Sequence, residues 1–147
     1  MVYKTAYRGK LRVSKSKFHN ELDVRAYKKE RWKLLHEYAY TTQILHEYPT
    51  KITAPGGFIT DLASIPKIVR SLIPQVGKHR GAAVIHDFLY STSDKHSYSR
   101  LQVDRVFLEA MKTAGVSLWK RHAMFYAVRS GGWIFFNKRR KGENSNS

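Results

Sequence analysis

Cysteine is absent from the 147 residues of this chain. The absence excludes disulfide bridges and metal sites built from thiolates. Any bound metal would therefore be held by oxygen atoms or by imidazole nitrogens. Since a protein without disulfides depends on its apolar core for stability, the composition also has to supply such a core, and 42% of the residues are hydrophobic.

Long apolar runs are also absent. Met1 to Thr5 at the N-terminus is followed by no apolar stretch that would serve as a signal peptide. No run elsewhere approaches the roughly 20 apolar residues that a membrane-spanning helix needs. We therefore expect a protein without a transmembrane segment that is soluble where it is made.

Acidic residues are scarce: the chain has 11 Asp and Glu against 27 Lys and Arg, a formal net charge of +16. A field of this sign favours a polyanionic partner, which would be nucleic acid, an anionic membrane or an acidic protein, and charge alone does not choose among them. A basic surface that only aids solubility is the plainer alternative. Five of the 11 acids nevertheless fall between Phe58 and Met111, among apolar neighbours. This central segment is therefore where we look for chemistry.

The length and the order of the patterns predict one domain of the α+β class, with strands first and helices after. Residues 1–57 are predicted to be β-rich, because alternating stretches such as Tyr7 to Val13 and Trp32 to Thr42 occur there. Residues 58–136 are predicted to form a loop followed by two or three packed helices. The tail, 137–147, is basic and polar, and we expect it to be disordered.

Periodicity and capping residues locate the helices more closely. Gly81 to Tyr90 is apolar except at three positions, and Ser99 to Ala114 carries an apolar stripe at helical spacing. Gly115 is placed to end this second helix, and Ser117 to begin a third helix that reaches Arg129. The first element of the central segment, Phe58 to Pro66, is predicted to be a turn or loop, because two glycines precede it and a proline closes it.

His86, Asp87 and Tyr90 form a polar window on the first predicted helix. At about 100° per residue they fall within one arc of roughly a quarter turn, and apolar side chains cover the rest. A buried His beside a carboxylate needs partners, so the window should face a metal, water or another side chain. If the second helix packs by its apolar stripe, Asp104 at the edge of that stripe reaches the ring of His86. The result would be a base oriented by a carboxylate.

Asp61 lies in the predicted loop, where backbone carbonyls of the following residues are free to turn toward an ion. Asp61, Asp87 and such a carbonyl would form a site for a hard cation, and calcium suits oxygen ligands with a single nearby His better than zinc does. The metal would polarise an ester carbonyl while His86 removes a proton from water. The plainer alternative is that His86 and Asp87 are a buried polar pair that organises helix packing.

Three segments resemble a family found in tailed phages and prophages, known as domain of unknown function 1353. They are GFITDLASIP at 57–66, AAVIHDFLY at 82–90 and DRVFLEAM at 104–111. The resemblance extends from about Trp32 to Trp133. It implies a phage origin, with the host cytoplasm or the virion as the location, and supplies no activity.

The pattern His86-Asp87-x-x-Tyr90, with Asp104 in the next helix, is similar to phospholipase A(2) enzymes, including the cysteine-free domains in some viral capsid proteins. This resemblance implies that His86 is the base and Asp87 a calcium ligand, with Tyr90 and Asp104 as the supporting network. Asp61 and the carbonyl of Leu62 resemble the calcium loop of the bacterial members.

These observations support three functional hypotheses. The leading one is a phage-encoded, calcium-dependent hydrolase of the phospholipase A(2) type that acts on lipid esters and is attracted to anionic membrane by its charge. The second is a non-enzymatic virion or assembly protein that binds DNA or an acidic partner, such as another phage structural protein, and uses the His-Asp network only for packing. The third is another metal-dependent hydrolase acting on phosphoesters, against which the lack of further paired His ligands counts.

Overall fold

The computed structural model describes residues 15–29, 31–61, 77–131 and 136–137. Within these residues all the strands precede all the helices, which confirms the α+β class. The predicted strand from Tyr7 to Val13 and the basic tail from Lys138 onward lie outside the described residues. None of the described helices is long and apolar enough to cross a membrane.

The strands are short and form two antiparallel three-stranded sheets. One sheet has the order β1-β4-β5, from Lys17–Phe18, Tyr38–Thr42 and Thr50–Ala54, and the other has the order β2-β3-β6, from Val24–Lys28, Arg31–Leu34 and Ile59–Thr60. The stretch predicted as one alternating unit from Trp32 to Thr42 is thus divided between β3 of one sheet and β4 of the other. The predicted loop that starts at Phe58 was wrong at Ile59–Thr60, because this pair hydrogen-bonds to β3 with Thr60 opposite Trp32.

Three helices follow: α2 (Arg80–Ser91), α3 (Arg100–Thr113) and α4 (Leu118–Gly131). The predicted end of α3 at Gly115 is confirmed, and the helix also has a start signal that was not predicted. Ser99 and Gln102 form a reciprocal capping box at its N-terminus. Gly115 follows its C-terminus with φ of +80°, a conformation that glycine adopts without the steric cost of a Cβ.

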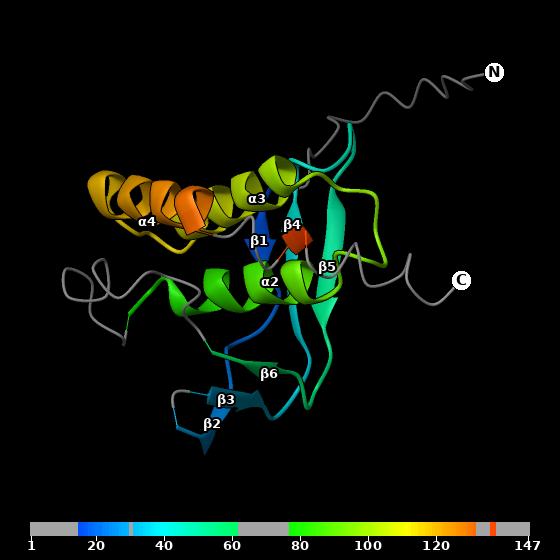
Figure 1. Cartoon of the computed structure of the whole chain (residues 1–147), viewed down its shortest axis with the longest axis vertical. Helices are drawn as coiled ribbons and strands as arrows, with labels where there is room; N and C mark the ends of the chain where they lie inside the picture. The colour runs from blue at the N-terminus through cyan, green and yellow to red at the C-terminus, as the bar shows by residue number, and fades with distance from the viewer. Residues whose placement is uncertain (1–14, 30, 62–76, 132–135, 138–147) are drawn as a thin grey trace, which may run out of the picture.

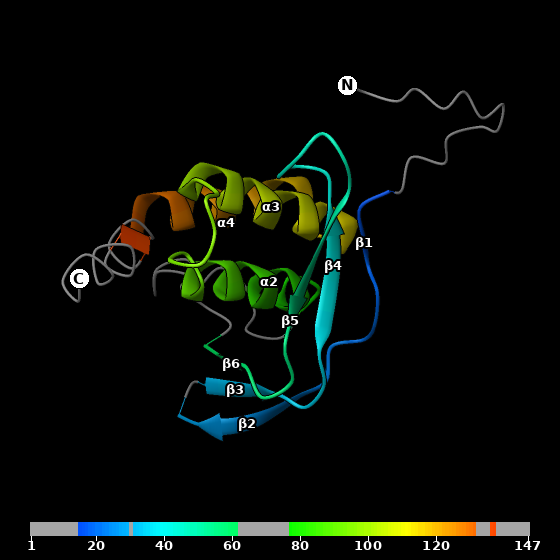
Figure 2. The ribbon, with the colours of Figure 1, turned by 90° about the vertical axis from the view of Figure 1, so that its right-hand side faces the viewer.

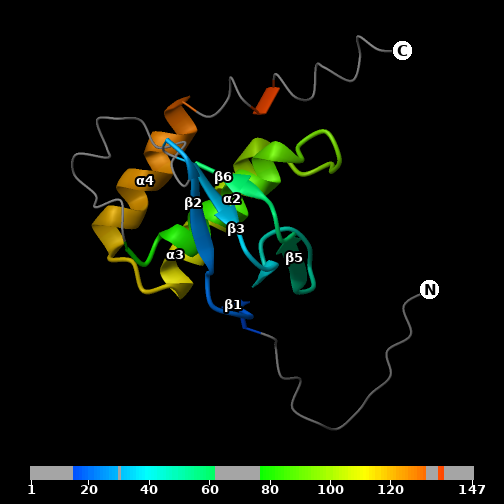
Figure 3. The same ribbon diagram turned by 90° about the horizontal axis from the view of Figure 1, so that it is seen from below.

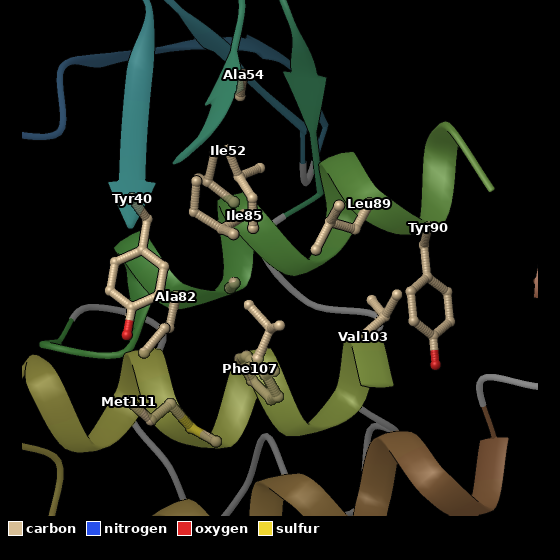
Figure 4. Close-up of a cluster of buried hydrophobic side chains, with 14 of the residues drawn as sticks. Tyr40, Ile52, Ala54, Ala82, Ile85, Leu89, Tyr90, Val103, Phe107 and Met111 are labelled. Carbon is tan, nitrogen blue, oxygen red and sulfur yellow. The ribbon is translucent and has the colours of Figure 1, made fainter. Parts of the chain in front are cut away.

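Helix α2 lies at the centre of the fold. Figures 1 and 2 show it between the layer of α3 and α4 and the small β2-β3-β6 sheet, and Figure 3 shows that sheet in front of α2 when the molecule is seen from below. Side chains of β4, β5, α2 and α3 meet in the main hydrophobic cluster, where the labelled residues include Tyr40, Ile52, Ile85 and Phe107 (Figure 4). A helix enclosed in this way explains why Gly81 to Tyr90 is apolar on nearly every side.

Gly81 permits the close approach of α2 to the first sheet. A Cβ at this position would overlap the hydroxyl group of Tyr38 in β4. Because Tyr38 is itself buried in the core, neither group has room to move aside. The N-terminal turn of α2 is therefore held in one position against β4.

Candidate functional site

The polar side chains of the α2 window contact two different elements, α3 and β6. His86 hydrogen-bonds to α3, whereas the next residue, Asp87, accepts a hydrogen bond from the hydroxyl of Thr60 in β6. Successive residues on a helix differ by about 100° in direction, so two adjacent side chains reach elements on different sides of α2. The His-Asp pair thus joins α3 to the β2-β3-β6 sheet through the central helix.

Asp104 of α3 is the centre of the network on the α3 side. His86 Nε2 lies 2.8 Å from Asp104 Oδ1, and the Tyr90 hydroxyl donates to the same oxygen at 2.6 Å. Arg129 of α4 donates from Nη1 to the other oxygen, Oδ2, at 2.8 Å. The predicted contact between Asp104 and the ring of His86 is confirmed, and Tyr90 joins it.

Burial and charge fix the ionisation of this carboxylate. The Asp104 side chain has no exposed surface, and two guanidinium groups face its Oδ2 atom, Arg129 at 2.8 Å and Arg100 at 3.8 Å. Burial alone would raise the pKa of Asp104, but hydrogen bonds from His86, Tyr90 and Arg129 hold the pKa below its ordinary value. Burial, together with the bond to Asp104, raises the pKa of Tyr90 far above that of a free phenol. Asp104 is therefore an acceptor and Tyr90 a donor.

The ionised state of Asp104 sets the tautomer of His86. A carboxylate can only accept a hydrogen bond, so the proton of the neutral ring resides on Nε2 and the lone pair on Nδ1. The ring is 2% exposed and is held between Tyr90, at 4.2 Å between centroids, and Phe107, at 4.8 Å. Hydrogen bonding and packing together orient one basic nitrogen, Nδ1, and this is the arrangement that a general base requires.

The carboxylates predicted to bind metal lie toward β6. Asp61 is exposed and follows β6 directly, and Asp87 is half-buried and bonded to Thr60, the residue before Asp61. Leu62 lies outside the described residues. No cluster of three or more His, Asp or Glu side chains suited to one ion occurs in the described part of the chain. Asp61 and Asp87 are carboxylates, the ligand type that calcium prefers, and a calcium ion with its usual six to eight ligands would need further oxygens.

Three network members were not predicted from the sequence: Arg100, Arg129 and Thr60. Arg100 had a usable signal, because it stands four residues before Asp104 on the same helix, the spacing of a helical ion pair. Arg129 and Thr60 had none, since each reaches the site only through the packing of separate elements. The roles of base, support and metal ligand assigned to the predicted residues stay predictions.

The comparisons with known proteins place the site within a family. The sequence matches the family described as "Protein of unknown function (DUF1353)" over residues 32–128, which include His86, Tyr90 and Asp104. A relative among the curated proteins is "Uncharacterized protein y4jT" of Sinorhizobium fredii (strain NBRC 101917 / NGR234), 36% identical over 84 residues, which are 56% of this chain and 24% of that protein. The match therefore spans about a quarter of the relative's length. No solved structure matches the chain.

Proposed function

The chain belongs to the DUF1353 family, and we propose that it is a calcium-dependent lipid esterase of the phospholipase A(2) type, encoded by a phage or prophage. The single observation that carries the proposal is the bond between His86 Nε2 and the buried, ionised Asp104, which leaves Nδ1 as a basic nitrogen. The positions of the two residues match the motif on which the resemblance to phospholipase A(2) rests. The phage origin rests on the resemblance of the three sequence segments.

His86 would act on a water molecule. Its Nδ1 atom removes a proton from water while the water oxygen forms a bond to the carbonyl carbon of the lipid ester. The bond from that carbon to the alcohol oxygen then breaks, and the proton passes from Nδ1 to the departing oxygen. Fatty acid and free alcohol are the products. Asp104 stabilises the positive charge of the ring between the two proton transfers, and Tyr90 and Arg129 hold Asp104 in place.

Asp87 and Asp61 would hold the metal, together with the carbonyl of Leu62 that the resemblance implies. Bound calcium would polarise the ester carbonyl and stabilise the negative charge that develops on its oxygen. The contribution of the chain is to keep Asp87 adjacent to His86 on one helix, with the Thr60 hydroxyl fixing the orientation of its carboxylate. The two functional groups then have a constant separation along α2.

The decisive experiment measures fatty acid released from phosphatidylglycerol vesicles by the full chain, with calcium and with chelator. His86→Gln keeps an N–H donor near Asp104 but has no basic nitrogen, so we expect a folded protein with turnover about 10²–10⁴-fold lower. Glu109→Gln, on α3 but facing β4 and outside the network, is the matched control and should retain turnover. Equal turnover in wild type and His86→Gln, or no turnover by the folded wild type, would refute the esterase.

Calcium is tested separately by titration calorimetry. Wild type should bind calcium, and Asp87→Asn should bind it at least about tenfold more weakly, because one charged ligand becomes a neutral amide. Circular dichroism checks that the variant remains folded. Binding that is the same in both proteins would remove Asp87 from the metal site.

A second candidate is a basic, non-enzymatic phage structural or assembly protein that binds DNA. The observation in its favour is that Arg129 and Arg100 already neutralise Asp104, as they would in a purely structural ion pair. Under this proposal duplex DNA affinity would fall steeply with salt and would be unchanged in His86→Gln. DNA binding of that kind, with no ester hydrolysis by wild type, would favour the second candidate over the first.

A further inference from the structure

The outward face of α4 carries large apolar side chains that nothing in the described structure covers. Leu118, Trp119 and Tyr126 are 62%, 60% and 64% exposed. Trp119 and Tyr126 are seven residues apart, so they lie on the same side of the helix about two turns from each other. The opposite side of α4 packs into the core through Met124 and Val128. The helix is thus apolar on both sides, as a helix is when both sides have a neighbour.

The charges around this face have one sign. Helix α4 contains Lys120, Arg121 and Arg129 and no acidic residue. Lys120 Nζ lies 5.6 Å from the centroid of the Trp119 ring, so a cation and an exposed indole occupy one place on the surface. Over the whole chain Lys and Arg outnumber Asp and Glu by 27 to 11. An anionic partner with an apolar interior complements such a surface.

We infer that the outward face of α4 is the surface by which the protein docks on anionic lipid membrane. Trp and Tyr place an apolar ring among the acyl chains and a polar atom at the headgroups, Leu118 adds buried apolar area, and Lys120 beside Trp119 faces the anionic headgroups. The inference rests on the proposed lipid esterase for its biological purpose, while the binding itself is independent of turnover. Such docking brings the protein to its substrate.

The charge of α4 argues against a second copy of the chain as the occupant. Two α4 faces in contact would bring Lys120 of each copy together with no carboxylate of either helix between them. Like charges in an interface from which water is excluded are destabilising. The same helix also carries Arg129, which donates to Asp104, so the docking face and the candidate site share one helix.

The test is co-sedimentation with phosphatidylglycerol vesicles in the presence of chelator, so that no hydrolysis accompanies binding. The double variant Trp119→Ala with Tyr126→Ser should bind at least about tenfold more weakly, because it loses most of the apolar area inserted in the bilayer. Tyr48→Ser is the matched control, since Tyr48 is 63% exposed on the β4–β5 loop and should not affect binding. Lys120→Glu should reduce binding and its dependence on salt.

The inference is overturned if the double variant and wild type bind phosphatidylglycerol vesicles equally, or if wild type binds phosphatidylcholine vesicles as well as phosphatidylglycerol vesicles. It is also overturned if the double variant loses self-association or DNA binding while it retains vesicle binding. The esterase proposal fails separately. His86→Gln should sediment with vesicles as wild type does, so binding without any fatty acid release by wild type would keep the docking face and remove the enzyme. If the double variant binds and hydrolyses vesicles as wild type does, the enzyme is kept and the docking face is removed.

Discussion

Helix α3 carries two carboxylates that each bind a buried tyrosine, and the two networks differ in their other members. Asp104 faces α2 and α4, and Glu109, five residues later, faces β4. Glu109 Oε1 accepts from the Tyr40 hydroxyl at 3.0 Å and from Thr42 Oγ1 at 2.7 Å. The donors to Glu109 are hydroxyl groups and the backbone N–H of Gln43, all of them neutral. This second network joins the helix to the first sheet.

The partners of Glu109 are all neutral, whereas those of Asp104 include charged groups. The Glu109 network shows that neutral donors are enough to attach α3 to a neighbouring element. Asp104 has the same kind of tyrosine partner and, in addition, an imidazole ring and two guanidinium groups around a side chain without exposed surface. The imidazole is the group that would carry the proposed chemistry.

The largest effect on stability is expected from Asp104→Ala. The substitution leaves His86, Tyr90 and Arg129 without their acceptor in a buried place, so the free energy of unfolding should fall by about 3–5 kcal/mol. Glu109→Ala removes a half-buried acceptor from neutral donors and should cost about 1–3 kcal/mol. Urea denaturation followed by circular dichroism measures both. Equal losses would mean that the two networks are alike and that the Asp104 network is only structural.

The next largest effect on stability is expected from acid, which protonates Asp104 and so weakens its network. Because the pKa of folded Asp104 is lower than that of the unfolded chain, its contribution to stability is fully present above the unfolded pKa of about 3.9 and is lost as the pH falls through the folded value. The free energy of unfolding, measured from neutral pH into strong acid, should therefore decline less in Asp104→Asn than in wild type. Identical pH dependence in the two proteins would contradict the ionised state assigned to Asp104.

The two tyrosines give a smaller and more selective pair of effects. Tyr90→Phe removes a donor to a fully buried carboxylate and should lower the free energy of unfolding by about 2 kcal/mol, and Tyr40→Phe by about 1 kcal/mol. Only Tyr90→Phe should also reduce ester hydrolysis, since only Tyr90 orients the carboxylate that holds His86. A reduction of hydrolysis by both variants to the same degree would mean that it follows stability and not the site.

Glu109→Gln should have the smallest effect. The amide oxygen still accepts from Tyr40 and Thr42, so the free energy of unfolding should change by less than about 1 kcal/mol. Hydrolysis should be unchanged. A loss as large as that of Asp104→Ala would show that the charge of Glu109, and not only its hydrogen bonds, stabilises the contact with β4.

The helical half of the fold was largely predictable from the sequence, because its signals are local. Ser99 with Gln102 caps α3, Gly115 ends it, and the apolar residues between them recur at helical spacing. The contact of His86 with Asp104 followed from the same patterns, since two helices packed by their apolar stripes bring the polar residues at the edges of the stripes together.

The strands and the outer members of the site were less predictable, because their partners are distant in the chain. Ile59–Thr60 is too short to show an alternating pattern and becomes a strand only by pairing with β3. Arg129 reaches Asp104 across 25 residues, and its role depends on how α4 lies against α3. The metal ligands are the least determined, since Leu62 lies outside the described residues.

The spacing of the two carboxylates on α3 limits which insertions and deletions the chain can accept. One residue added between Asp104 and Glu109 would rotate the two ends of the helix by about 100° relative to each other, so that only one of the networks could keep its partners. One residue added in the connection from 92 to 99 would leave the directions of Asp104 and Glu109 on the helix unchanged, because α3 begins again at its own capping box. Length variation among relatives should therefore be concentrated before Ser99 and after Gly115, with the intervening helix constant in length.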